Sequence, residues 1–214
     1  RFALRNGANA ICEKPLVLNP WNVEALMELE KESGHSINNI LQLRLHPVII
    51  NLREKILSAN SAKKHKVSLD YITSRGAWYD VSWKGDESKS GGIATNIGIH
   101  FFDMLIWVFG KVQTLEVSHY AAHKASGTIE LEHAFVEWNL SIDADDLPKQ
   151  ARNEGKRTFR CIVVDGEELE FSEGFGDLHT LSYRKILEGN GFPCSEVLPS
   201  IQLVHDIRNR RFKK

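Results

Sequence analysis

The chain has 214 residues, of which 42% are hydrophobic and 26% are charged, with a formal net charge of −1 at pH 7. These values are ordinary for a soluble globular protein, and the balanced charge excludes the strongly basic field that nucleic-acid and membrane-surface binding need. We therefore expect no nucleic-acid partner. No uninterrupted apolar run approaches 18 residues, so we expect no membrane partner either. The three cysteines lack metal-ligand spacing and predict a reducing, cytoplasmic location.

The first 45 residues carry the pattern of two strands joined by a helix. These elements are predicted at residues 9–12, 20–33 and 37–43. Asn19 and Pro20 are typical of a helix start, and Gly34 is typical of a helix end. This order is the grammar of a doubly wound sheet, so residues 1–45 predict the last strand–helix–strand of a Rossmann domain.

Residues 46–214 predict a separate α+β domain for substrate binding and oligomerisation, built on an antiparallel sheet with helices on one face. Strands are expected at residues 66–74, 114–121, 128–139, 158–164 and 168–172, the last two joined by Asp165-Gly166. Helices are expected at residues 48–58, 95–109, 178–189 and 198–214, and loops at 75–92 and 143–157. The predicted fold class is therefore α/β plus α+β.

Glu13, Lys14 and Pro15 follow the first strand directly. In a parallel sheet this carboxyl edge is where ligands bind. A partly buried ammonium there can polarise a substrate hydroxyl and stabilise an alkoxide. Taken alone, a lysine at a strand end is more often structural or solvated, and neighbouring Cys12 is expected to be buried packing.

His100 lies in an apolar segment that follows Gly91 and Gly92, where the backbone can approach a neighbour closely. Oxidation of a secondary alcohol by hydride transfer needs a base, and histidine suits that task near neutral pH. Asn96 lies four residues before His100 on one helix face, and Asp103 lies one turn after it. A histidine on so apolar a helix is otherwise a core residue, but together with Lys14 it favours a catalytic pair.

The segment from Arg75 to Asp86 combines arginine, lysine and three large aromatic residues just before the histidine helix. Arginine offers a bidentate fork for a carboxylate or phosphate, so Arg75 and Tyr79 are predicted to contact the substrate. The alternative is that the tryptophans pack beneath the loop.

Gln42, Arg44 and His46 alternate with apolar residues at the end of a predicted strand. In a strand they would share one face and line the active site or a neighbouring subunit. The alternative is a surface of ion pairs.

Two further groups of polar residues give weak signals. Asp177 and His179 precede a predicted helix and either cap it or touch the substrate, with capping favoured. His119, His123 and His133 lie in a strand region without a completing cysteine or acid, so no metal site is predicted.

The motif Glu13-Lys14-Pro15 and the segment 91–103 together resemble the inositol-dehydrogenase and glucose-fructose-oxidoreductase (Gfo/Idh/MocA) family of NAD(P)-dependent sugar dehydrogenases. Residues 71–105, 171–192 and 199–208 are similar to the UDP-N-acetylglucosaminuronate 3-dehydrogenases. Such enzymes oxidise the 3-hydroxyl of UDP-2-acetamido-2-deoxy-glucuronic acid. An aminotransferase then acts on the ketone, on a route to the O-antigen of bacterial lipopolysaccharide.

The resemblance implies a role for each motif. Lys14 holds the 3-hydroxyl and borders the nicotinamide of NAD, with Glu13 and Pro15 beside the cofactor. His100 takes the hydroxyl proton while the hydride passes to NAD.

The resemblance also implies substrate contacts from Arg75, Tyr79 and Asn96. Arg75 or a neighbour would pair with the uronate carboxylate, and a site built for that group rejects the neutral sugar. The family usually has Asp where this chain has Asn96, so Asn96 is interpreted as a hydrogen-bonding ligand rather than part of a proton relay.

The resemblance predicts a homotetramer or dimer whose Gly-rich turn precedes Arg1, so the chain alone is expected to bind NAD poorly and to be inactive. Alternatives are another sugar or inositol dehydrogenase of the same family, or a non-catalytic sugar-binding or oligomerisation module. A module has no need for the base His100.

Overall fold

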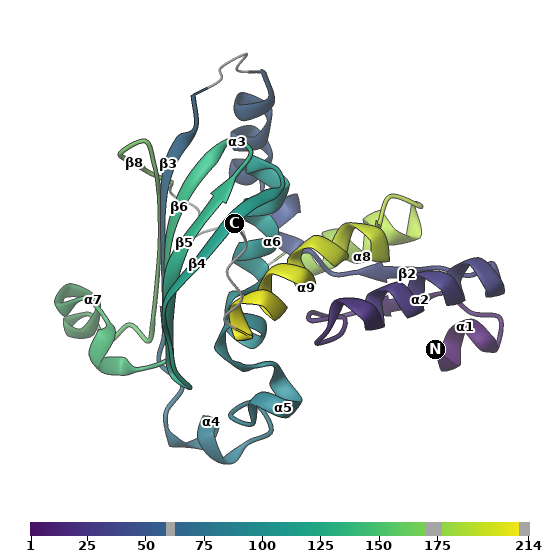
Figure 1. Ribbon diagram of the computed structural model, residues 1–214, viewed down its shortest axis with the longest axis horizontal. Helices are drawn as coiled ribbons and strands as arrows, with labels where there is room; N and C mark the ends of the chain where they lie inside the picture. The colour runs from purple at the N-terminus through teal and green to yellow at the C-terminus, as the bar shows by residue number, and fades with distance from the viewer. Residues whose placement is uncertain (59–62, 170–176, 210–214) are drawn as a thin grey trace.

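The computed structural model describes residues 1–58, 63–169 and 177–209 (Figure 1). The strands are β1 (Ala10–Cys12), β2 (Ile37–Asn39), β3 (His65–Thr73), β4 (Val112–Tyr120), β5 (Lys124–Leu131), β6 (Ala134–Ser141), β7 (Thr158–Val164), β8 (Glu167–Glu168) and β9 (Phe192–Pro193). The α-helices are α1 (Phe2–Arg5), α2 (Pro20–Ser33), α3 (Pro47–Ser58), α4 (Ala77–Val81), α5 (Glu87–Ser90), α6 (Ile99–Phe109), α7 (Lys149–Asn153), α8 (Leu178–Leu187) and α9 (Cys194–Arg208). Tighter or wider turns form the 3-10 helices η1 (Gln42–Leu45) and η3 (Ala144–Asp146) and the π-helix η2 (Ala94–Gly98).

The small sheet has the order β1-β2-β9 in the described part of the chain. β1 and β2 are parallel and are joined by α2, which confirms the predicted strand–helix–strand order. Gly34 ends α2 in the left-handed conformation, as its position predicted. β9 arrives from the other end of the chain and pairs antiparallel with β2. The division at residue 45 stays a prediction.

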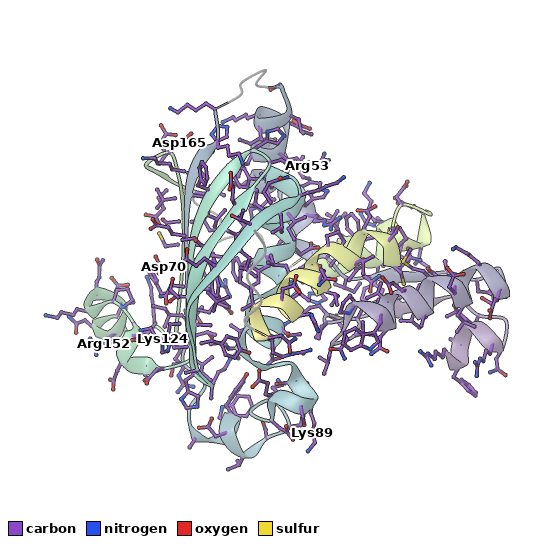
Figure 2. All side chains as sticks on the ribbon, in the orientation of Figure 1. Arg53, Asp70, Lys89, Lys124, Arg152 and Asp165 are labelled. Carbon is purple, nitrogen blue, oxygen red and sulfur yellow. The ribbon has the colours of Figure 1, made fainter. Side chains whose placement is uncertain are left out.

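The large sheet has the order β4-β5-β6-β3-β7-β8 over the described residues. Its pairs are antiparallel except for β3 and β6, which are parallel. A mixed α/β fold is therefore present, with helices α6 and α9 on one face of this sheet (Figure 1). The opposite face carries Asp70 and Lys124 (Figure 2). The predicted strand at residues 168–172 is present only at Glu167–Glu168, and its remainder lies outside the described residues.

The single strand predicted at residues 128–139 was wrong, because the chain reverses between β5 and β6. Ile129 and Leu131 face the helices before the turn, and Val136 and Trp138 face them after it. The turn residues are glutamate and histidine, which carry no turn signal, so the reversal could not be read from composition.

Short helices interrupt both regions predicted as loops, since α4 and α5 lie within residues 75–92 and η3 and α7 within 143–157. The last helix was predicted from residue 198 but begins at Cys194. Pro199 therefore lies inside α9, where its ring nitrogen cannot bond the carbonyl of exposed Ser195.

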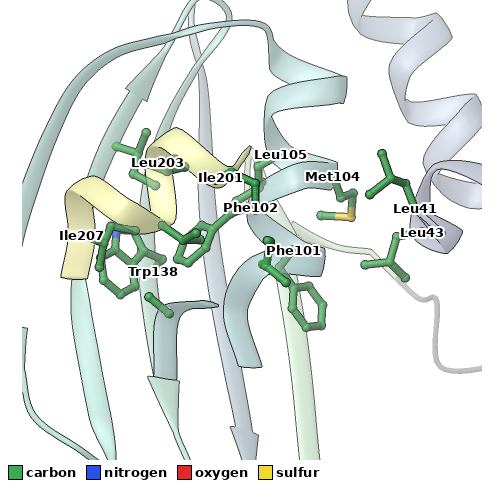
Figure 3. Close-up of a cluster of buried hydrophobic side chains, with 14 of the residues drawn as sticks. Leu41, Leu43, Phe101, Phe102, Met104, Leu105, Trp138, Ile201, Leu203 and Ile207 are labelled. Carbon is green, nitrogen blue, oxygen red and sulfur yellow. The ribbon is translucent and has the colours of Figure 1, made fainter. Parts of the chain in front are cut away.

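Apolar side chains of α6, α9 and the large sheet form the main core (Figure 3). The Phe102 ring packs edge-on against Trp138, with ring centroids 5.3 Å apart. The helical run Glu87–Phe109 is long and apolar enough to cross a membrane, but 72% of its most apolar window is buried inside the protein. That burial is the arrangement of a core helix, in which each large apolar side chain contributes about 1.5–3 kcal/mol.

Arg44 does not lie on a strand face, because residues 42–45 form a 3-10 helix. Its side chain is 4% exposed and forms a bidentate pair with Asp103 of α6, at 2.9 and 2.8 Å. It also donates to the carboxylate and the carbonyl of Glu196 on α9. Arg44 thus belongs to a buried ion pair between helices and does not line the active site or a subunit surface, while the roles of Gln42 and His46 stay predictions.

We expect Asp103→Ala to destabilise the fold by about 3–5 kcal/mol, because it leaves a buried guanidinium short of a partner. The double variant Arg44→Met with Asp103→Leu should recover most of that loss, because it removes both charges. Urea unfolding of the three proteins measures the difference. Equal stability of Asp103→Ala and the wild type would contradict a structural role for the pair.

Candidate active site

Lys14 lies just beyond the carboxyl end of β1, at a cis peptide bond to Pro15. Its Nζ donates a hydrogen bond to the backbone carbonyl of Asn96, at 2.9 Å. The two motifs are 82 residues apart in the chain and meet at this contact. An ammonium has three donor hydrogens, and no side-chain acceptor bonds Lys14 among the described residues, so donors remain for a ligand.

Asn96 belongs to the π-helix η2, which leads directly into α6. The predicted single helix at residues 95–109 is therefore two helices of different pitch. π-turns are frequent at functional sites. Gly91 begins this region at φ +75°, and a Cβ there would lie 2.7 Å from the Thr95 side chain. Glycine is thus required where the chain turns from α5 into η2.

Tyr79 and Asn96 form a second contact within the site. The Asn96 amide donates to the Tyr79 hydroxyl at 2.9 Å, and Tyr79 is only 3% exposed. The hydroxyl fixes the orientation of the amide, which leaves the Asn96 side-chain oxygen as an acceptor for a ligand.

The pKa of Lys14 is lowered to about 8, mainly by burial and then by the positive charge of Arg75. Glu13 opposes the shift, and Lys84 adds to it weakly. Lys14 therefore remains mostly protonated at neutral pH, yet it loses its proton far more readily than a surface lysine.

His100 lies on α6, four residues after Asn96. Burial lowers its pKa to about 3, and the positive charges of Lys14, His179 and Arg160 add to that shift. The imidazole is consequently neutral at pH 7 and has a nitrogen lone pair available to accept a proton.

Arg75 follows β3 and enters the site from the large sheet. Its Nε is buried without a hydrogen-bond partner, and its charge acts on both Lys14 and Tyr79. A buried guanidinium atom that lacks a protein acceptor is costly, so this position favours an anionic ligand.

Two further residues act on His100: His179, for which the sequence left a cap or a substrate contact open, and Arg160, which was missed as a site residue. His179 of α8 lies with Nε2 3.2 Å from Oε1 of Glu13, so it contacts a predicted cofactor residue. Asp177 occupies the N-cap position without a side-chain capping bond, so the predicted cap was wrong. Arg160 on β7 pairs in register with Tyr71, over whose ring its guanidinium lies at 5.7 Å.

The sequence gives one signal for Arg160 as a site residue: it is the one charged residue in the otherwise apolar strand sequence from Phe159 to Val164. Nothing in the sequence links His179 to Glu13, since 166 residues separate them. Within the described residues, no group of three histidine, cysteine or acidic side chains is placed to hold a metal ion.

Comparison with known proteins adds to this geometry. Residues 63–147 match the family described as "Oxidoreductase family, C-terminal alpha/beta domain" of the Gfo/Idh/MocA group. A crystal structure of the WlbA (WbpB) dehydrogenase from Thermus thermophilus, in complex with NAD and alpha-ketoglutarate, is 50% identical over 97% of this chain, with a TM-score of 0.93. The chain belongs to the Gfo/Idh/MocA oxidoreductase family. The resemblance inferred from the motifs is thereby confirmed.

Other similar proteins vary in how much they share with the chain. The Thermus thermophilus enzyme in complex with NAD and UDP-GlcNAcA is also 50% identical, with a TM-score of 0.91. The WlbA dehydrogenase from Bordetella pertussis is 18% identical with a TM-score of 0.78, which shows a common fold. YteT of Bacillus subtilis is 26% identical over 111 residues, or 51% of this chain.

The chain spans only part of these relatives. It covers 67% and 66% of the two Thermus thermophilus chains, and the match to YteT covers 26% of that protein. The chain therefore does not account for a whole relative.

We expect Lys14→Met to be more stable than the wild type at pH 7, because it removes a partly buried charge. The pKa of Lys14 is about 8 in the folded protein and 10.5 in the unfolded chain. Below pH 8 Lys14 is protonated in both the folded and the unfolded state, so the folded state bears the full cost of burying the charge. Between pH 8 and pH 10.5 the folded protein has lost the proton and the unfolded chain still holds it, so that cost falls. The stability advantage of the variant should therefore shrink as pH rises through this window. Thermal melts at pH 7 and pH 10 measure it.

Lys149→Met, at an exposed position on α7, is the matched control and should change the melting temperature at neither pH. An advantage of Lys14→Met that is the same at both pH values would mean that packing, not charge, decides its stability.

Proposed function

We propose that this chain carries the substrate-binding and acid–base half of an NAD-dependent dehydrogenase that oxidises the 3-hydroxyl of UDP-2-acetamido-2-deoxy-glucuronic acid. The observation that carries the proposal is that the hydrogen bond from Lys14 to the carbonyl of Asn96 places a protonated lysine near a neutral His100, on which its charge acts. The half-identical Thermus thermophilus relative, solved with NAD and UDP-GlcNAcA, supports this substrate.

The residues at the end of β1 fit the nicotinamide end of NAD. Lys14 keeps donor hydrogens at the carboxyl edge of the parallel pair, and Pro15 and Glu13 adjoin it. When bound there, NAD would supply the carbon that accepts the hydride from the sugar.

Lys14 and His100 would divide the remaining work. The Lys14 ammonium donates to the oxygen of the 3-hydroxyl and stabilises the negative charge that develops there. The neutral His100 ring accepts the hydroxyl proton as the carbon–oxygen double bond forms. Partial burial of both groups strengthens these interactions, because less water competes for them.

A negatively charged substrate also solves a difficulty in this site. A base with a pKa of about 3 holds its proton poorly, and the positive charges around His100 contribute to that value. A uronate carboxylate beside Arg75 would offset those charges and make His100 more basic when substrate is bound. The carboxylate thus serves recognition and catalysis together.

The open face of the large sheet supports the proposed homotetramer or dimer. It carries a hollow of about 410 Å³ next to Phe135, whose side chain is 52% exposed. Burying such a face against a second copy would remove apolar surface from water. Three free cysteines support a cytoplasmic setting, where a pathway aminotransferase would consume the ketone on the route to bacterial O-antigen lipopolysaccharide.

The proposal is tested by NADH absorbance at about 340 nm, using the protein made from the complete reading frame that encodes this chain. NAD is supplied with UDP-N-acetylglucosaminuronate or with UDP-N-acetylglucosamine, and aminotransferase and glutamate pull the reaction. We expect turnover of the uronate alone. No turnover of either by a folded, NAD-binding protein would reject this substrate and favour another sugar of the same family.

We expect His100→Asn to lower kcat by about 10²–10⁴-fold, since it removes the base but keeps hydrogen bonding.

The wild-type kcat/KM should fall above pH 8, where Lys14 loses its proton. In Lys14→Arg this alkaline fall should vanish, because a guanidinium stays charged, although the rate is lower. A pH profile of Lys14→Arg that matches the wild type would contradict the role of Lys14.

Arg75→Met should raise KM for the uronate by about 10–100-fold, because it deletes a charge-assisted pair. The same change should leave any weak activity on the neutral UDP-N-acetylglucosamine nearly unaltered. Steady-state kinetics with both sugars measures the ratio. An equal loss on the two sugars would mean that Arg75 does not pair with the carboxylate.

A further inference from the structure

Residues 77–90 form an outlying segment, which carries α4 and α5 and extends past one end of the large sheet (Figure 1). The segment packs tightly within itself. A Cβ on Gly85 would lie 2.7 Å from the carbonyl oxygen of Tyr79, and the Ser82 hydroxyl donates to the same oxygen at 2.8 Å. The outlying segment is therefore a compact unit, and its position depends on the contacts that hold it from outside.

One side of the outlying segment reaches the candidate active site. The Tyr79 side chain is buried, and its hydroxyl accepts a hydrogen bond from the Asn96 amide at 2.9 Å. Because this hydroxyl orients the amide, a displacement of the outlying segment would also release Asn96 from its present orientation.

The other side of the outlying segment contacts the hairpin formed by β4 and β5. Nε2 of His123 lies 2.6 Å from Oδ1 of Asp80 on α4. The Tyr120 hydroxyl donates to Oε1 of Glu87 on α5 at 2.9 Å. A histidine that carries a hydrogen on Nε2 donates to a carboxylate in either charge state, so the first contact does not need a charged ring. Both helices of the segment are thus bonded to the same hairpin.

The tip of this hairpin is itself fixed to the large sheet. The amide of Ala121 donates to the carbonyl of Lys124 at 2.7 Å and closes the turn. The amide of Ile142 donates to the carbonyl of His123 at 3.0 Å, and the carbonyl of Ile142 accepts from the amide of Arg75 at 3.3 Å. The backbone of Ile142 therefore joins the hairpin tip to the residues that lead into the outlying segment.

A hollow of about 430 Å³ lies beside α5, so this helix is not closely packed on every side. The hollow is lined by Glu87 and Ser88 of α5 and by Leu18, Asn19, Arg208 and Asn209. Since packing does not hold α5 at this hollow, the contacts with the hairpin have more influence on where the segment lies.

We propose that His123 and Tyr120 are positioning residues of the active site, which hold the outlying segment so that Tyr79 keeps the Asn96 amide oriented for the substrate. The inference rests on the proposed function for the role of Asn96, whereas the hold on the segment is independent of any substrate. A side chain that is oriented before binding loses less freedom when the ligand arrives, so the hold favours binding.

The test uses the full-length enzyme and two measurements. The rate of trypsin cleavage after Lys84, followed by the mass of the fragment that begins at Gly85, reports whether the segment is held. KM for the UDP-uronate reports whether the site is positioned. Exposed contacts are individually weak, so His123→Ala and Tyr120→Phe should each raise both quantities about 2- to 5-fold, and the double variant about tenfold, with kcat changed less.

Three further variants separate positioning from a general loss of structure. His123→Gln keeps an N–H donor for Asp80 and should restore most of the wild-type behaviour. His133→Ala is the matched control, because His133 is exposed in the turn at the other end of β5, and it should change neither measurement. In a Tyr79→Phe background, His123→Ala should still speed cleavage but should raise KM no further, because the link to Asn96 is already broken.

Cleavage and KM that are unchanged in both His123→Ala and Tyr120→Phe would overturn the proposal. Faster cleavage with an unchanged KM, or an equal rise of KM with and without the Tyr79 hydroxyl, would also overturn it, because the hold would then not act on the site through Tyr79. A wild type that does not turn over the UDP-uronate would reject the proposed function, and cleavage of the variants would still decide whether the hairpin holds the segment.

Discussion

The hydrogen bond from Lys14 to the carbonyl of Asn96 is the contact on which the arrangement of the site depends. It joins the end of β1 to the π-helix that leads into α6, and so it brings a cation and His100 to one place. The acceptor is a backbone carbonyl, so the contact specifies the path of the chain at Asn96 and leaves its side chain free to turn toward Tyr79. The backbone thus positions the candidate site residues.

The buried ion pair of Arg44 and Asp103 holds α6 in the position that this contact requires. Arg44 links the segment after β2 to α6 and, through Glu196, to α9. Burying two charges brings little net stability, but their fork geometry admits one relative placement of the helices. We infer that the ion pair fixes the position of α6 along its axis relative to the small sheet. It thereby also fixes the distance between Lys14 and His100.

The sequence was sufficient for the parts of the protein that depend on local pattern. Gly34 and the βαβ order predicted the first sheet, and recognisable motifs indicated Lys14 and His100. The reversal between β5 and β6 was missed because ordinary residues form it, and the 3-10 turn at Arg44 was missed because alternation alone resembles a strand. The contact of His179 with Glu13 could not be predicted, because it depends on tertiary packing across 166 residues.

The excess of positive charge at this site is unfavourable in the free protein, and in the proposed enzyme it would favour an anionic ligand. Burial lowers the pKa of Lys14 most, and the positive charges of Arg75 and Lys84 lower it further. An anionic substrate removes this repulsion on binding, whereas a neutral sugar leaves it in place. In the proposed enzyme, selectivity for charge would come from electrostatic repulsion already present in the free protein, and few contacts would be needed solely to reject the neutral sugar.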